Sequence, residues 1–118
     1  MDRKAKWAAL ILALLPAGGM CIEDVPTLAG ECEACHGPAG VSTETDVPPL
    51  AGKSVTWLRE MLDQFHNYER HCTTTTYRHG DRARTPTSMC GIANSLSDED
   101  KQALAEYFAN AVPNAVGE

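Results

Sequence analysis

Apolar side chains recur at helical spacing in three stretches of the chain. The first stretch covers residues 25–35, where Asp24 can cap the start and Pro26 is tolerated in the first turn. Its apolar positions fall at i, i+3, i+4 and i+7, on one face of a helix. They are Val25, Leu28, Ala29 and Cys32. The pattern predicts an amphipathic helix near the start of the domain.

The second and third stretches repeat this spacing. Residues 54–68 begin at Ser54, a suitable N-cap, and the third stretch begins at Ser97. There Ser97 and Asp100 form a variant of the capping box, and the acidic first turn favours the helix dipole. Pro113 is expected to stop this last helix. The apolar positions of the two stretches are Leu58, Met61, Leu62 and Phe65, then Leu104, Tyr107, Phe108 and Ala111.

The connections between these stretches are irregular. Residues 37–53 are rich in Gly and Pro, and residues 69–96 are long, polar and without a clear pattern. No convincing β-strand alternation is present, so we expect an all-α fold with three or more helices. Such a fold has too little helix-to-helix contact to be stable alone, and a loop this long is usually functional. Something else is expected to fill the middle of the domain.

The first 19 residues have the features of a secretory signal. A basic start precedes a short apolar run, and small residues suited to cleavage follow. The run is about half the ~20 residues of a membrane-spanning helix. An uncleaved amphipathic or anchoring helix is the alternative. We expect residues 1–19 to be removed and residues 20–118 to form one domain that is periplasmic or otherwise exported.

Charge narrows the choice of partners. The chain has 10 Lys and Arg against 16 Asp and Glu, a formal net charge of −6 at pH 7. An acidic body is poorly suited to nucleic acid, so no nucleic-acid partner is expected. It suits a protein that meets its partners through a local patch.

The run CEACH at residues 32–36 has the C-x-x-C-H spacing of a haem attachment site. Two thiols three residues apart at a helix end can each reach a vinyl group on one porphyrin edge, forming thioethers. The next residue, His36, then places an imidazole under the iron. A thioredoxin-like pair would need a βαβ pattern, and a zinc site would need a second ligand pair, and neither is found. A plain disulfide between Cys32 and Cys35 is the remaining alternative.

With these residues the sequence resembles the class I cytochrome c family over roughly residues 24–112. The run CEACHG at residues 32–37 matches that family's haem motif, and PPLAGK at residues 48–53 looks like its P-x-L-x-G turn. The segment from Leu96 to Tyr107 is similar to its C-terminal helix. In its details the sequence is most similar to small bacterial members and to haem subunits of flavocytochrome c sulfide dehydrogenases. The resemblance implies one covalent haem c.

The resemblance also implies individual roles. Pro48 would correspond to the proline whose carbonyl accepts the Nδ1 proton of His36 and fixes its tautomer. Tyr107 would correspond to the aromatic residue that packs on the N-terminal helix. The chain departs from the family at Asp24, where many members have a Gly, so the crossing of the terminal helices is expected to be altered.

The family usually takes its second axial ligand from the loop before the last helix, and Met89 is the methionine there. A thioether opposite His36 raises the reduction potential, which suits an electron carrier. Met61 competes, but a Met within an apolar stripe is more often core. A bis-His site is the other alternative, and its candidates are His66, His71 and His79.

Three cysteines remain after the haem motif. A bridge between Cys72 and Cys90 would close a loop of about 18 residues, stabilise the fold by roughly 3 kcal/mol and pin the loop that bears Met89. Two free thiols are the alternative, which an exported protein disfavours. Cys21 is left over. It could carry a lipid tether, stay free or link to another subunit.

A basic segment borders the ligand loop and contains Arg70, Arg78, Arg82 and Arg84. It could pair with haem propionates, steer an acidic redox partner or be an ordinary solvated loop. We expect an electron carrier rather than an enzyme, with redox proteins such as a flavoprotein or a terminal oxidase as partners. The alternatives are a haem-bearing subunit of an oxidoreductase complex, for example a sulfide-oxidising flavocytochrome, and a haem sensor with an open axial site.

Overall fold

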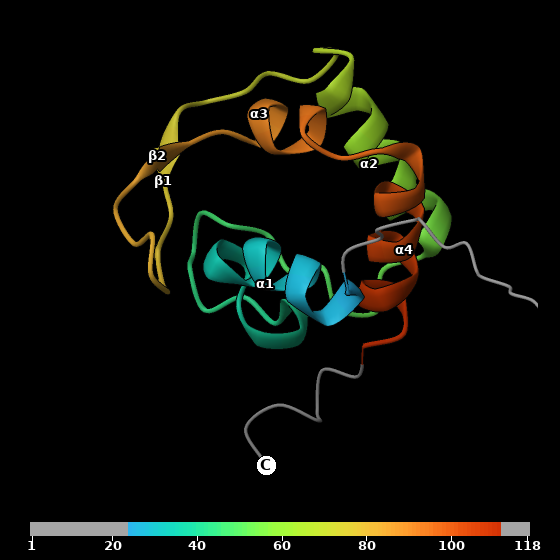
Figure 1. Cartoon of the computed structure of the whole chain (residues 1–118), viewed down its shortest axis with the longest axis horizontal. Coiled ribbons are helices and arrows are strands. Elements are labelled where there is room, and N and C mark those ends of the chain that lie inside the picture. Colours follow the sequence, from blue (N-terminus) through green and yellow to red (C-terminus); the bar gives the residue numbers. More distant parts are fainter. Residues whose placement is uncertain (1–23, 112–118) are drawn as a thin grey trace, which may run out of the picture.

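The computed structural model describes residues 24–111. The predicted signal segment, Cys21 and Pro113 lie outside the described residues. Within them the chain folds into short helices and one two-stranded ladder, drawn in Figure 1. In chain order the elements are α1 (Val25–His36), the 3₁₀ turn η1 (Pro38–Gly40), α2 (Val55–His66), β1 (Thr75–Thr76), β2 (Pro86–Thr87), α3 (Met89–Asn94) and α4 (Asp98–Ala109). The predicted all-α fold is confirmed.

The predicted first helix forms and extends one residue further, to His36. Asp24 takes the N-cap position, but its carboxylate accepts a hydrogen bond from the Thr27 hydroxyl at 3.2 Å instead of capping the backbone. The helix ends at Gly37, which has a φ of 86°. A Cβ there would overlap the carbonyl oxygen of Val41, so the residue after His36 has to be glycine.

The second and last helices begin as their caps predict. The Ser54 hydroxyl accepts a hydrogen bond from the Trp57 backbone N–H at 3.0 Å. Ser97 and Asp100 form the reciprocal capping box. Helix α4 ends at Ala109, so Ala111 lies beyond the helix, and its predicted place among the apolar positions of that helix is wrong.

The stretch predicted as irregular contains two elements that sequence reasoning missed. Helix α3 is only six residues long, and β1 pairs with β2 in an antiparallel ladder of two residues each. Neither is long enough to show a hydrophobic period. These elements divide residues 69–96 into a hairpin followed by a short helix.

The core is small and lies where α1, α2 and α4 meet. Leu104 and Phe108 of α4 are 2% exposed, and Ala29 of α1 is fully buried. Tyr107 is half-buried, and its hydroxyl lies 3.5 Å from the Glu33 carboxylate of α1. None of the described helices is long and apolar enough to cross a membrane.

An ion network joins α2 to α4. The ammonium of Lys101, which is 3% exposed, donates to the Asp63 carboxylate at 2.9 Å and lies 3.5 Å from Asp98. Arg59 contacts the same two carboxylates. The hydrogen bond from Lys101, together with Arg59, holds the pKa of Asp63 below its usual value. A buried lysine makes this network a structural requirement.

We expect Asp63→Asn to lower the free energy of unfolding at pH 7 by roughly 1–3 kcal/mol, because buried Lys101 loses its closest carboxylate. The pKa of Asp63 is lower in the folded protein than in the unfolded chain. The higher free energy of unfolding of the wild type is therefore present above about pH 4 and is lost as the pH falls through the folded pKa of Asp63. Urea unfolding of both proteins from about pH 7 to about pH 3 measures this.

Glu60→Gln is the control, since Glu60 is exposed on the same helix. A difference in the free energy of unfolding between wild type and Asp63→Asn that did not depend on pH would contradict the pairing of ionised Asp63 with Lys101.

Candidate functional site

A cavity of about 800 Å³ lies between the helices and the hairpin. Its walls are mostly apolar and include Leu58, Leu62, Phe65, Ile92, Leu104 and Phe108. Figure 1 places α1 and α3 on opposite sides of this space, with α2 and α4 to one flank. Its volume and apolar lining are typical of a site for a cofactor-sized molecule.

The last turn of α1 presents both motif thiols and the histidine to the cavity. Cys32 and Cys35 are free thiols, so the alternative of a plain disulfide between them is not formed. Burial, with smaller contributions from Glu33 and Cys35, raises the pKa of Cys32 to about 12. The thiol is therefore neutral at neutral pH.

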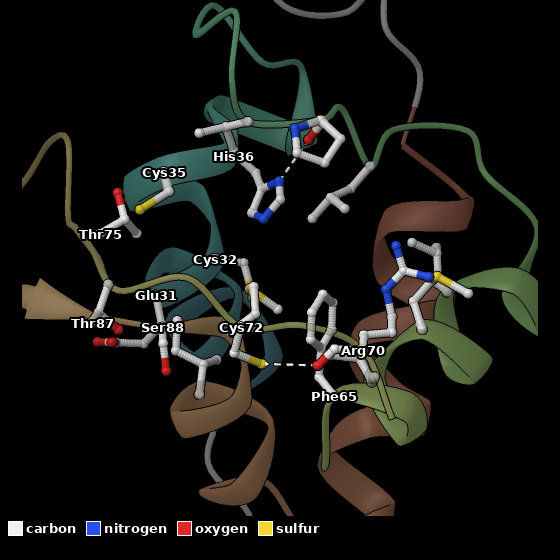
Figure 2. Close-up of a pocket in the computed structure, with 18 of the residues that line it drawn as sticks. Glu31, Cys32, Cys35, His36, Phe65, Arg70, Cys72, Thr75, Thr87 and Ser88 are labelled. Carbon is white, nitrogen blue, oxygen red and sulfur yellow. Dashed lines mark hydrogen bonds between the residues drawn. The ribbon is translucent and has the colours of Figure 1, made fainter. Parts of the chain in front are cut away.

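The imidazole of His36 is oriented by a backbone carbonyl. Its Nδ1 lies 2.6 Å from the carbonyl oxygen of Pro48, the partner that the resemblance implies. When Nδ1 donates to this oxygen, Nε2 keeps its lone pair, and Figure 2 shows that nitrogen facing the open centre. Burial lowers the pKa of His36, although the Pro48 bond opposes this. Burial is the larger effect and favours the neutral ring, while the Pro48 bond leaves Nε2 available to bind a metal.

The structure narrows the candidates for a second ligand without choosing one. Met89, the first residue of α3, lines the cavity, and so do Met61 of α2 and His71. His66 and His79 do not line it: His66 lies 3.3 Å from the Ala93 carbonyl and His79 lies 3.5 Å from Glu44. Two of the three histidines of the bis-His alternative are thus placed elsewhere.

Cys72 and Cys90 form a disulfide with a Cα–Cα distance of 5.8 Å, well within the usual range. This is the pairing inferred from the sequence. Cys90 is 3% exposed and directly follows Met89, and Cys72 directly follows His71. The bridge therefore joins the two segments that carry the candidate ligands outside α2.

Two of the four arginines of the basic segment have acidic partners. Arg78 pairs with Glu44 and Asp46, while Arg82 pairs with Glu31 and lies over the Tyr77 ring at 4.5 Å. Arg70 lies 5.3 Å from the Phe65 ring and lines the cavity, as Figure 2 shows. Sequence reasoning did not identify these acidic partners, because they come from segments more than 30 residues away.

The residues present fit a covalently attached haem. One wall of the cavity holds two free thiols and, next in the sequence, an imidazole that is oriented by a hydrogen bond. The remaining walls are mostly apolar. Cys32 and Cys35 would hold the macrocycle through thioethers, and His36 would ligate its iron. Fold and site together define a small c-type haem domain.

Comparison with known proteins supports a c-type haem domain. Residues 22–111 match the cytochrome c family, and the chain belongs to that family. Members carry covalently bound haem c, so the domain described here is an electron-transfer module with one such haem.

Several curated proteins are similar. The chain is 39% identical over 89 residues to the thiosulfate dehydrogenase electron acceptor of Stutzerimonas stutzeri (strain A1501), a match that covers 75% of this chain and 36% of that protein. It is 35% identical over 82 residues to cytochrome c4 of Pseudomonas aeruginosa, covering 70% and 34%. Cytochrome c4 of Azotobacter vinelandii is 31% identical over 85 residues, covering 72% and 38%. The chain spans about a third of the length of these relatives.

We expect the double variant Cys32→Ser, Cys35→Ser to lose covalent haem completely, because no thiol remains at the cavity wall to form a thioether. After expression with a haem-attachment system, mass spectrometry under denaturing conditions should find one haem on the wild type and none on the variant. The control Cys72→Ser, Cys90→Ser should keep its haem. Covalent haem on the first variant would contradict the attachment site.

Proposed function

We propose that this protein is an exported electron carrier in which His36 and Met89 are the axial ligands of the haem iron. When bound, haem c supplies an iron that takes up and gives back one electron at a time between its ferric and ferrous states. The observation that carries the proposal is the cavity itself. One wall holds Cys32, Cys35 and His36, and Met89 lies in another.

Among the three candidates, Met89 has the best local support. It is the first residue of α3, whose N-cap Ser88 accepts a hydrogen bond from the Gly91 N–H at 3.1 Å. The neighbouring disulfide restricts its backbone further. Met61 lies in the apolar stripe of α2, where a methionine is more often core than ligand, and His71 is exposed and lies on no helix. A thioether ligand raises the potential and favours electron exchange over substrate binding.

The name of one relative indicates an electron donor for this chain. That protein accepts electrons from thiosulfate dehydrogenase. The resemblance to haem subunits of sulfide-oxidising flavocytochromes indicates the same chemical class. We infer that the electrons come from an enzyme that oxidises inorganic sulfur compounds.

Export rests on the predicted signal at residues 1–19, with residues 20–118 as the mature domain. The Cys72–Cys90 disulfide supports this location, because structural disulfides persist in oxidising compartments such as the periplasm. Cys21 is the candidate for a tether or for a link to another subunit. Co-purification of a flavoprotein with the exported chain would favour the complex-subunit alternative over a free carrier.

The ligand assignment has a direct spectroscopic test. The oxidised wild type should show the weak far-red band of sulfur-to-iron charge transfer, and Met89→Ala should abolish it because the iron loses its thioether. Reduced Met89→Ala should then bind carbon monoxide without denaturation. Met61→Ala and His71→Ala are matched controls at the same cavity and should keep the band. A wild type without the band that binds carbon monoxide would instead support the sensor alternative.

The donor assignment is tested with purified proteins. A thiosulfate-oxidising dehydrogenase should reduce the oxidised cytochrome in a stopped-flow experiment only when thiosulfate is present. The rate should fall as ionic strength rises if charged surfaces guide docking. Reduction by a sulfide-oxidising flavoprotein and not by this enzyme would move the assignment to the flavocytochrome class.

A further inference from the structure

The segment of residues 70–88, here called the strap, runs from the end of α2 out to the hairpin, at the left of Figure 1, and back to α3. Its Thr73, Thr74 and Thr75 line the cavity, and the Cys35 Sγ lies 3.9 Å from the Thr76 carbonyl oxygen. At one end the Cys72–Cys90 disulfide ties it to α3. A second anchor lies in its middle, at Arg78, and contacts a different wall of the cavity.

Arg78 joins the strap to the loop that leads to Pro48. Its guanidinium makes a fork with Asp46, through Nη1–Oδ1 at 3.0 Å and Nη2–Oδ2 at 3.1 Å. Nη1 also donates to Glu44 at 3.1 Å. Asp46 is two residues before Pro48, whose carbonyl orients the His36 ring. The fork therefore contacts the wall that carries the His36 ligand.

The same side chain also contacts the first strand of the hairpin. Nε donates to the Thr76 carbonyl at 3.1 Å, and Nη2 donates to the Thr75 hydroxyl at 2.9 Å. Thr75 pairs with Thr87 in the β1–β2 register, and Thr87 is two residues before Met89. One continuous path of contacts thus runs from the Pro48 loop through Arg78 and the hairpin to Met89.

Every nitrogen of the guanidinium is engaged, since Nε, Nη1 and Nη2 all have protein acceptors. The Arg78 side chain is 19% exposed, so the protein covers most of its surface. Bidentate charge-assisted bonds fix orientation as well as distance, which the point charge of a lysine does not do. Arg78 is therefore built to hold two walls in register and has no donor nitrogen left for a haem propionate.

We propose that Arg78 is a positioning residue that holds the His36 wall and the Met89 wall at the separation needed for both side chains to bind one iron. The proposal rests on the assignment of Met89 as a ligand. Axial ligands need placement within about half an ångström, and a weak thioether bond is the first to fail when a supporting contact is lost. Arg78 acts through Asp46 on one side and through Thr75 and Thr76 on the other.

The test compares three arginine variants of the haem-loaded protein. Arg78→Leu should lose at least about half of the far-red sulfur-to-iron band, and its reduced form should bind carbon monoxide, because the two walls are no longer held at ligand distance. Arg78→Lys should show a smaller loss, since the charge is kept without the fork. The control is Arg59→Leu. Arg59 also bonds two carboxylates, those of Asp63 and Asp98, and is 26% exposed, but it does not line the cavity.

Arg59→Leu should lower the melting temperature and leave the band and carbon monoxide binding at wild-type values. If Arg78→Leu does not fold, Asp46→Asn removes the same fork at a side chain that is 67% exposed, and it should weaken the band in the same direction. An unchanged band in these variants, beside a wild type that shows it, overturns the role of Arg78 alone. If the wild type lacks the band and Met89→Ala has the same spectrum as the wild type, the ligand assignment is overturned and this proposal with it.

Discussion

A cavity of about 800 Å³ is large for a domain whose described core consists of a few side chains where α1, α2 and α4 meet. Folding must offset a large loss of chain entropy, and a core this small contributes little toward that. A covalently tethered haem supplies the missing apolar body, and the thioether link keeps it in place. The fold and the electron-transfer site are therefore one structure, since the group that carries the electron also completes the core.

The remaining walls are held by polar contacts and one covalent bond. Lys101 and Arg59 bind shared carboxylates between α2 and α4, and the Cys72–Cys90 disulfide ties one end of the strap to α3. Arg78 engages the loop before Pro48. Such contacts are directional, so they control the relative position of walls that a large apolar core would otherwise fix. In a carrier this matters because the ligand distance and the access of water to the iron tune the reduction potential.

The sequence predicted well wherever one short segment carries the whole signal. The helix at residues 25–35, the caps at Ser54 and Ser97, and the thiol pair beside His36 all depend on spacing within a few turns. It missed α3 and the hairpin, which are too short to form a period. It also treated the arginines of residues 70–84 as one basic patch, although Arg78 and Arg82 have acidic partners elsewhere in the chain.

What the sequence determined by itself is therefore the haem attachment motif, because covalent geometry within one helical turn brings Cys32, Cys35 and His36 to the same face. Only the tertiary structure decided what surrounds that face. It aligned Pro48 with the His36 ring, brought Met61 and His71 to the cavity beside Met89, and engaged Arg78 with Asp46. These contacts join residues 12 or more positions apart, and the path of the folded chain, which local spacing does not reveal, sets their distances.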